Sequence, residues 1–123
     1  MRENSRADRV GDEIKSVIAS ALLLETRDER LQQVEVTGVR VSPDLTVAKV
    51  FWVMVASEPP NKAVRDRTAK ALAVAAGFLR SNMAKNLRLR SVPTLTFAFD
   101  ESVESGRQME TLLAKLPKPA DEE

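Results

Sequence analysis

The order in which the hydrophobic period changes along the chain constrains its fold more than any other feature. Apolar side chains recur at helical spacing in a first segment, alternate as in strands in the next two, and return to helical spacing in a long fourth segment. The predicted elements are a helix over residues 5–25, strands over 34–41 and 46–55, helical structure over 61–87, a strand over 95–99 and a short helix over 103–116. This order predicts a small α+β domain in which helices cover one face of a three-stranded sheet.

Glycine and proline mark the irregular points of these segments. A change of phase at Thr37-Gly38 predicts a β-bulge in the first strand, and Ser42-Pro43-Asp44 predicts a turn between the first two strands. Gly77 lies inside the long helical segment, where a glycine costs about 1 kcal/mol relative to alanine. We therefore expect a kink or a break at Ala75-Ala76-Gly77, where small side chains would allow another backbone to approach closely.

The composition removes several classes of function. None of the 123 residues is cysteine or histidine, so disulfides, thiol nucleophiles and histidine bases are absent. The chain also has no glycine-rich phosphate loop, no GxSxG motif and no paired carboxylates at a diagnostic metal spacing. We therefore expect a protein that is not an enzyme and that has no cofactor, no metal and no small-molecule substrate.

The ends of the chain and its apolar runs suggest where it acts. The longest apolar stretch, Ala71 to Leu79, is much shorter than the roughly 20 residues of a membrane span. The first residues lack the apolar core of a secretory signal. We expect a cytoplasmic protein without membrane contact, with one domain over residues 1–116 and a flexible charged tail over 117–123.

Charge is distributed unevenly, although the formal net charge is only +1. Residues 1–66 sum to −1, residues 67–99 to +6 and residues 100–123 to −4. The central segment contains no acidic side chain and six basic ones, namely Arg67, Lys70, Arg80, Lys85, Arg88 and Arg90. Such a block often faces a polyanion, and a solvated helix face explains it about equally well.

The second half of the long helical segment separates apolar from basic side chains. On a helical wheel Leu79, Met83 and Leu87 cluster on one side. Arg80, Lys85 and Arg88 lie on a neighbouring, largely opposite side, where cations can contact phosphates and release counterions. The few aromatic side chains fit core positions at least as well as base-stacking ones. We therefore expect recognition of RNA shape and backbone rather than reading of single-stranded bases.

Several short groups of residues stand in an order that is typical of a known family. They are Arg6-x-x-Arg9-Val10, Asp28-x-Arg30-Leu31, Val36-Thr37-x-Val39-x-Val41-Ser42-x-Asp44-Leu45-x-x-Ala48-Lys49-Val50, Ala75-x-Gly77-Phe78-Leu79-Arg80, and Leu87-Arg88-Leu89-Arg90-x-Val92-Pro93-x-Leu95-x-Phe97-x-x-Asp100. Each group alone is weak, but together they cover about Arg6 to Leu116. In this order the sequence resembles bacterial ribosome-binding factor A.

The resemblance implies a type II KH-like domain, with the order helix-strand-strand-helix-kink-helix-strand and a kink at Ala75-Ala76-Gly77 in place of the usual GxxG RNA loop. It implies a central first strand, antiparallel to the second and parallel to the third. Proteins of this family bind free 30S ribosomal subunits through 16S rRNA, assist late 30S maturation and 16S rRNA processing, and are associated with cold adaptation. Phe51-Trp52 is bulkier than the family's usual pair, which puts the packing at that point in question.

The leading hypothesis is therefore a monomeric, non-catalytic RNA-binding assembly factor. The expected rRNA contacts are Arg80, Lys85, Arg88 and Arg90, with Arg6 and Arg9 in second rank and Gly77 setting the angle that presents them. The alternative is a protein-interaction adaptor that uses an apolar open sheet face at Phe51, Val53 and Val55, while the basic block serves only solubility.

Overall fold

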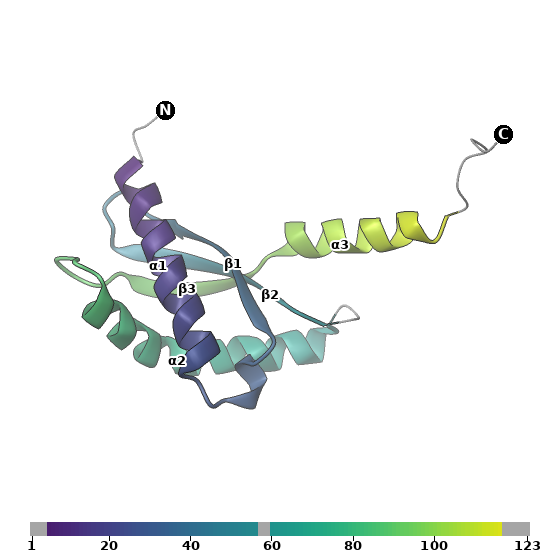
Figure 1. The fold of residues 1–123 in the computed structure, drawn as a ribbon, viewed down its shortest axis with the longest axis horizontal. Helices are drawn as coiled ribbons and strands as arrows, with labels where there is room; N and C mark the ends of the chain where they lie inside the picture. Colours follow the sequence, from purple (N-terminus) through teal and green to yellow (C-terminus); the bar gives the residue numbers. More distant parts are fainter. Residues whose placement is uncertain (1–4, 57–59, 117–123) are drawn as a thin grey trace.

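The computed structural model describes residues 5–56 and 60–116, arranged as a three-stranded sheet with helices (Figure 1). The predicted tail over residues 117–123 lies outside the described residues. The elements are α1 (Ser5–Leu24), the short 3₁₀ helix η1 (Glu29–Leu31), β1 (Val34–Val41), β2 (Val47–Met54), α2 (Lys62–Asn86), β3 (Thr94–Phe99) and α3 (Glu101–Ala114). The predicted α+β class is confirmed.

The sheet has the order β1-β2-β3, with β1 antiparallel and β3 parallel to β2. The expectation that the first strand is central is therefore wrong, and the second strand takes that place. The reason is burial, because β2 is apolar on both faces and four of its last five residues are buried. The predicted bulge is confirmed by a shift of register between Val36 and Gly38.

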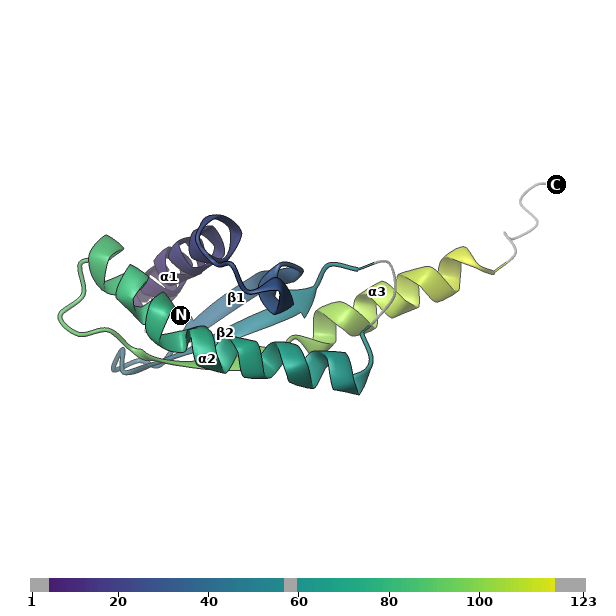
Figure 2. The ribbon, with the colours of Figure 1, turned by 90° about the horizontal axis from the view of Figure 1, so that it is seen from below.

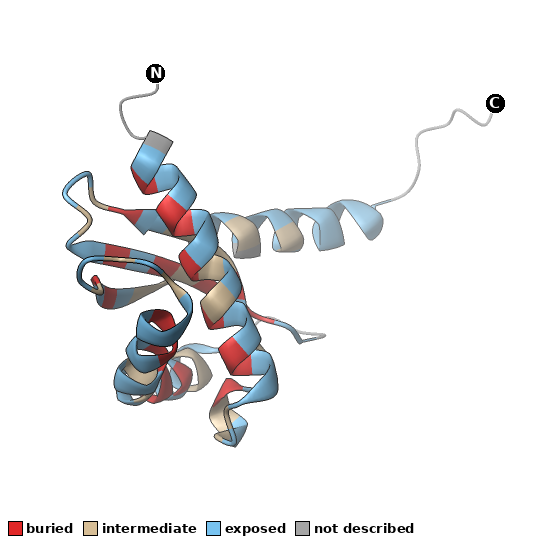
Figure 3. Cartoon of the chain, turned by 60° about the vertical axis from the view of Figure 1, so that its left-hand side comes forward, coloured by how far each residue is buried: buried red, intermediate tan, exposed pale blue. Residues whose placement is uncertain are grey.

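One face of the sheet carries the core, which α1 and α2 cover (Figures 1 and 3). Side chains that alternate along β2 point into this core, as Ala48, Val50 and Trp52 do. Trp52 is buried there and meets the Phe99 ring edge-on, with 5.1 Å between the ring centroids. The bulky Phe51-Trp52 pair is thus split between the two faces of the sheet, and only Trp52 enters the core.

Helix α2 is a single helix from Lys62 to Asn86, so of the two expected alternatives, a kink or a break, the break into two helices is not found. The hydrogen-bonded helix stays continuous, and its ribbon changes direction partway along (Figure 2). A Cβ built at Gly77 would meet nothing within 4 Å, so this glycine does not serve close backbone approach. The glycine that does so is Gly11 in α1, where a Cβ would lie 2.8 Å from the Val39 carbonyl oxygen of β1.

Helix α3 extends away from the sheet at the end opposite the β1–β2 turn (Figures 1 and 2). Asp100 caps its start by accepting a hydrogen bond from the Val103 backbone N–H at 3.2 Å. Arg107 ties the helix to the sheet, because its guanidinium donates to the Met54 carbonyl oxygen at 3.1 Å and to the Glu35 carboxylate at 3.4 Å. The apolar side chains in the second half of α3, Met109, Leu112 and Leu113, are exposed (Figure 3).

Candidate nucleic-acid interface

Two of the predicted contact residues lie on a loop and not on a helix. Helix α2 ends at Asn86, and Leu87, its C-cap, has extended backbone angles. Arg88 and Arg90 therefore belong to the α2–β3 loop, and the helical-wheel position expected for Arg88 is wrong. The helix ends because Leu87 and Leu89 both pack partly against the core, which draws the chain toward β3. The loop presents the exposed Arg88 and Arg90 on either side of the half-buried Leu89.

Arg80 has a different environment from the other predicted contacts, because it holds this loop in place. Its Nε donates to the Pro93 carbonyl oxygen at 3.1 Å, and its Nη2 donates to the Val92 carbonyl oxygen at 3.0 Å. Pro93 is itself fully buried, so one of the two hydrogen bonds from the guanidinium joins it to backbone that the core holds in place. Arg80 therefore positions the loop, although its side chain is itself exposed.

Three further exposed cations, which we call the loop cluster, are Lys85 in the last turn of α2 and Arg88 and Arg90 in the α2–β3 loop. Within residues 5–56 and 60–116, none of the three lies within ion-pair distance of a carboxylate. Some basic residues elsewhere have acidic partners, such as Arg30 with Asp28 at 2.7 Å and Arg65 with Glu101 at 3.2 Å. The loop cluster is therefore a set of uncompensated cations at the end of the sheet.

Arg6 and Arg9 are exposed and lie in the first turns of α1. The N-terminal end of α1, the α2–β3 loop and the β1–β2 turn all lie at the same end of the molecule, away from α3 (Figures 1 and 2). The fold thus brings the second-rank candidates to the same end as the loop cluster. No hydrogen bond within the described residues joins Arg6 or Arg9 to that cluster.

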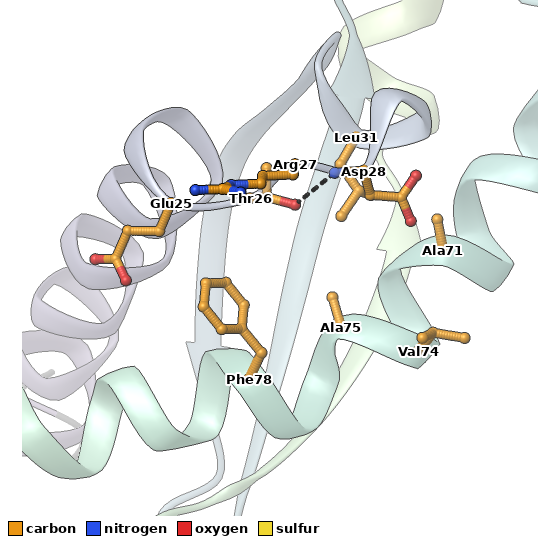
Figure 4. A pocket seen from close by; sticks show the side chains of 9 residues that line it. All are labelled: Glu25, Thr26, Arg27, Asp28, Leu31, Ala71, Val74, Ala75 and Phe78. Carbon is orange, nitrogen blue, oxygen red and sulfur yellow. Dashed lines mark hydrogen bonds between the residues drawn. The ribbon is translucent and has the colours of Figure 1, made fainter.

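The Ala75-Ala76-Gly77 segment, which the family resemblance puts in place of an RNA-binding loop, borders a pocket at Ala75. Ala75 lines a pocket of about 320 Å³ between the middle of α2 and the connection that follows α1 (Figure 4). Val74 and Phe78 form its apolar side, and Glu25, Arg27 and Asp28 form its polar side. The Arg30 guanidinium, with its backbone N–H, lowers the pKa of Asp28 by hydrogen bonding, so the pocket keeps an ionised carboxylate. Glu25 and Asp28 offset the charges of Arg27 and of the paired Arg30, so the pocket presents no net positive charge to a phosphate.

The open face of the sheet also differs from expectation. Val53 is completely buried, so the predicted apolar docking face of Phe51, Val53 and Val55 loses one of its three members. Sequence reasoning passed over the cations beside Phe51. The Lys49 ammonium lies 5.5 Å and the Arg40 guanidinium carbon 6.0 Å from the centroid of its ring. In the sequence Lys49 interrupts one otherwise apolar face of the second strand. Only the register of β1 against β2 shows that Arg40 lies beside it.

Residues 5–56 and 60–116 contain neither a metal-binding group of side chains nor a helix that could cross a membrane. In this part of the chain no group of three or more Asp, Glu, His or Cys side chains could hold a metal ion. None of its helices combines the length and the apolarity that crossing a membrane requires.

Comparison with known sequences gives one family. The sequence model described as Ribosome-binding factor A matches residues 6–113. Ribosome-binding factor A of Pseudomonas putida is 39% identical over 127 aligned positions, covering 98% of this chain and 95% of the relative. The protein of the same description from Thioalkalivibrio sulfidiphilus is 40% identical over 114 positions, covering 93% of this chain and 85% of the relative.

Solved structures give the same family. The crystal structure of ribosome-binding factor A from Thermus thermophilus matches with a TM-score of 0.64 and 25% identity, covering 76% of this chain and 93% of that one. The solution structure of a Thermotoga maritima protein described as a ribosome binding factor A of uncertain status matches with a TM-score of 0.64 and 28% identity, covering 77% and 87%. A Thermus thermophilus homology model fitted into the cryo-EM map of a 30S–RbfA complex shares the fold at 23% identity and a TM-score of 0.61, covering 77% and 96%. The chain belongs to the ribosome-binding factor A family.

Proposed function

We propose that this protein binds free 30S ribosomal subunits through 16S rRNA and assists late 30S maturation and 16S rRNA processing. In this proposal it acts as a cytoplasmic, monomeric and non-catalytic factor, and its part in cold adaptation follows from that role. Family membership supports ribosome binding, and the Thermus thermophilus relative was fitted into the map of a 30S complex. The loop cluster supports rRNA as the component that is contacted.

The observation that carries the proposal is the anchored, uncompensated charge of the α2–β3 loop. Lys85, Arg88 and Arg90 are exposed and have no carboxylate partner among the described residues. Arg80 fixes the loop through two carbonyl groups, which reduces the ordering entropy that binding would cost. Cations held in this way can contact the phosphates of a folded RNA, whose backbone geometry they would recognise.

Sedimentation of a bacterial lysate tests the proposal. The tagged protein, followed by blotting across a sucrose gradient, should accumulate with free 30S particles and be absent from 70S ribosomes and polysomes. The double variant Arg88→Glu/Arg90→Glu should move to the top of the gradient, because the loop would then repel phosphate. A matched double variant, Lys62→Glu/Lys115→Glu, changes the net charge by the same amount at sites outside the loop cluster. It should sediment as the unmodified protein does.

Two results would contradict the proposal. If the unmodified protein stays at the top of the gradient even at low salt, ribosome binding is absent. If both double variants leave the 30S fractions equally, net charge and not the loop cluster governs binding. Circular dichroism of each variant must show an unchanged thermal transition, which the exposure of all four substituted side chains leads us to expect.

A further inference from the structure

The open face of the sheet has a second basic surface, next to the loop cluster. Alternation along the strands puts Arg40 and Lys49 on this face, because their neighbours Val41 and Ala48 are buried on the helix side. Register places Arg40 directly opposite Lys49, and Lys49 directly opposite Thr96 of β3. Phe51 lies in the adjacent row, between Gly38 and Ala98.

The two cations on this face lack compensating charge. Cross-strand like charges directly opposite each other destabilise a sheet, and neither side chain forms an ion pair within the described residues. The carboxylates of β1 and of the β1–β2 turn hydrogen-bond to other groups and form no ion pair with either cation. Glu35 accepts from Arg107 at 3.4 Å, and Asp44 accepts from the Ser42 hydroxyl at 2.8 Å and the Thr46 hydroxyl at 2.7 Å. An anion placed over Arg40 and Lys49 would relieve their repulsion.

The Phe51 ring adds a second kind of contact at the same place. It is half-buried, and the Lys49 ammonium and the Arg40 guanidinium carbon lie over the ring, 5.5 Å and 6.0 Å from its centroid, at the outer limit of cation–π contact. A base that stacks on the ring would displace the two cations from the ring toward its own phosphates. An aromatic side chain flanked by cations is the combination that holds a single nucleic-acid strand. The base stacks on the ring, and the adjacent phosphates lie on the cations.

The position of this face relative to the loop cluster is set by β3. The α2–β3 loop leads directly into Thr94, and Thr96 lies two residues further on, opposite Lys49. Both surfaces therefore lie at the end of the sheet where β3 and β2 begin. Thr96 lies about 7 Å along β3 from Thr94, where the α2–β3 loop ends, at roughly 3.3 Å per residue.

We propose that the open sheet face formed by Arg40, Lys49, Phe51 and Thr96 binds single-stranded RNA, with one base stacked on Phe51 and its phosphates on Arg40 and Lys49. The inference rests on the proposed function for the biological source of the RNA and extends it from backbone contact at the loop to stacking on the sheet. An acidic protein segment is the competing occupant, and it would have no need of the ring face.

A short labelled RNA tests this inference directly. The probe is a single-stranded decamer of uridine that contains one 4-thiouridine and a 5′ fluorophore, and its binding is followed by anisotropy. Phe51→Leu keeps an apolar side chain but removes the ring, and we expect about tenfold weaker binding. Lys49→Glu and Arg40→Glu should each weaken binding at least as much, whereas the control Lys115→Glu at the C-cap of α3 should leave it unchanged. Photocrosslinking should give an adduct on the peptide that contains Phe51.

The outcomes separate this inference from the proposed function. If Phe51→Leu, Lys49→Glu and Arg40→Glu bind the decamer normally while Arg88→Glu/Arg90→Glu does not, the sheet-face inference is wrong and the loop proposal stands. If the charge variants bind weakly but Phe51→Leu binds normally without a crosslink at Phe51, stacking is refuted. If the crosslink forms but the unmodified protein never sediments with 30S particles, the sheet face binds RNA and the proposed ribosomal function fails.

Discussion

Gly11 and Gly77 are both helical glycines, but their surroundings are opposite. A Cβ at Gly11 would lie 2.8 Å from the Val39 carbonyl oxygen, whereas a Cβ at Gly77 would meet nothing within 4 Å. Gly11→Ala should therefore lower the free energy of unfolding by about 1–2 kcal/mol, since overpacking outweighs the gain in helix propensity. Gly77→Ala should raise it by about 1 kcal/mol. Urea unfolding followed by circular dichroism measures both changes.

Binding by the Gly77→Ala variant also tests the role expected for this residue from the sequence. Because α2 is continuous through Gly77, we expect the alanine variant to sediment with 30S particles as the unmodified protein does. Loss of binding with a raised unfolding free energy would show that the helix needs this glycine to change shape on binding. The opposite ranking of the two alanine variants in the urea experiment would contradict the close packing of α1 on β1.

Substitutions of Arg80 and Arg88 should differ in their effect on the free energy of unfolding, although both side chains are basic and exposed. Arg80 donates two hydrogen bonds to the carbonyl groups of Val92 and Pro93, whereas Arg88 donates none within the described residues. Arg80→Gln should therefore cost about 1 kcal/mol of unfolding free energy, and Arg88→Gln close to nothing. Thermal melts of the two variants compare them at equal loss of charge. Equal melting temperatures would show that the loop does not depend on Arg80.

At the scale of elements, the junction of β3 and α3 depends on one carboxylate. Asp100 accepts hydrogen bonds from the Thr37 hydroxyl at 2.6 Å, the Ser102 hydroxyl at 2.7 Å and the Val103 backbone N–H at 3.2 Å. The Thr37 bond, more than the others, lowers the pKa of Asp100 below its usual 3.8. Thr37 lies at the bulge of β1, so this carboxylate joins the start of α3 to the first strand.

The pH dependence of stability follows from this lowered pKa. A carboxylate whose pKa is lower in the folded state stabilises the fold above its unfolded pKa, here the usual 3.8, and this contribution is lost as pH falls through the folded value. Asp100→Ala should cost about 1 kcal/mol at pH 7, and its difference from the unmodified protein should shrink below about pH 4. Urea titrations at pH 7, 5 and 3 measure this, with the exposed Glu110→Ala as control. A difference that stays constant with pH would contradict the role given to the ionised side chain.

The elements themselves could be predicted well from the sequence, and their arrangement less well. The helix over residues 5–25 and the bulge at Thr37-Gly38 follow from local periodicity and are found within a residue. The central position of β2 agrees with the apolar residues on both of its faces and not with the strand order that the family resemblance implies, whereas the burial of Val53 depends on packing that no local pattern encodes. Arg88 was misplaced for a related reason, because the packing of Leu87 and Leu89 decides where α2 ends.

The candidate site shows the same division at the level of single side chains. The basic block and its lack of acidic residues could be read directly from the sequence, and the loop cluster comes from it. The role of Arg80 in holding the α2–β3 loop could not be read from the sequence, because its partners are backbone carbonyl groups twelve and thirteen residues away. The pairing of Arg40 with Lys49 could not be predicted, because the two residues lie on different strands within the segment of net charge −1. Only the register of β1 against β2 brings them together.

At the scale of the whole molecule, charge is separated along its length. The α2–β3 loop, the β1–β2 turn and the N-terminal end of α1 lie at one end, and α3, whose residues 101–114 include three glutamates and one arginine, projects from the other (Figure 1). A polyanion would therefore meet the molecule end-on, with the loop cluster foremost. Such an arrangement orients the protein before any close contact forms, since opposite charges at the two ends give it a dipole.

Salt dependence measures how many of these cations meet phosphate. If Lys85, Arg88 and Arg90 each neutralise one phosphate, the logarithm of the affinity for a 16S rRNA fragment should fall against the logarithm of salt concentration with a slope of about −2 to −3. Arg88→Ala/Arg90→Ala should reduce the magnitude of that slope by about two, whereas Lys62→Ala/Lys115→Ala should leave it unchanged. Because alanine removes charge without reversing it, a lower slope reports lost contacts and not new repulsion. A slope that is the same in all three proteins would mean that the end carrying the loop cluster is not the end that meets the RNA.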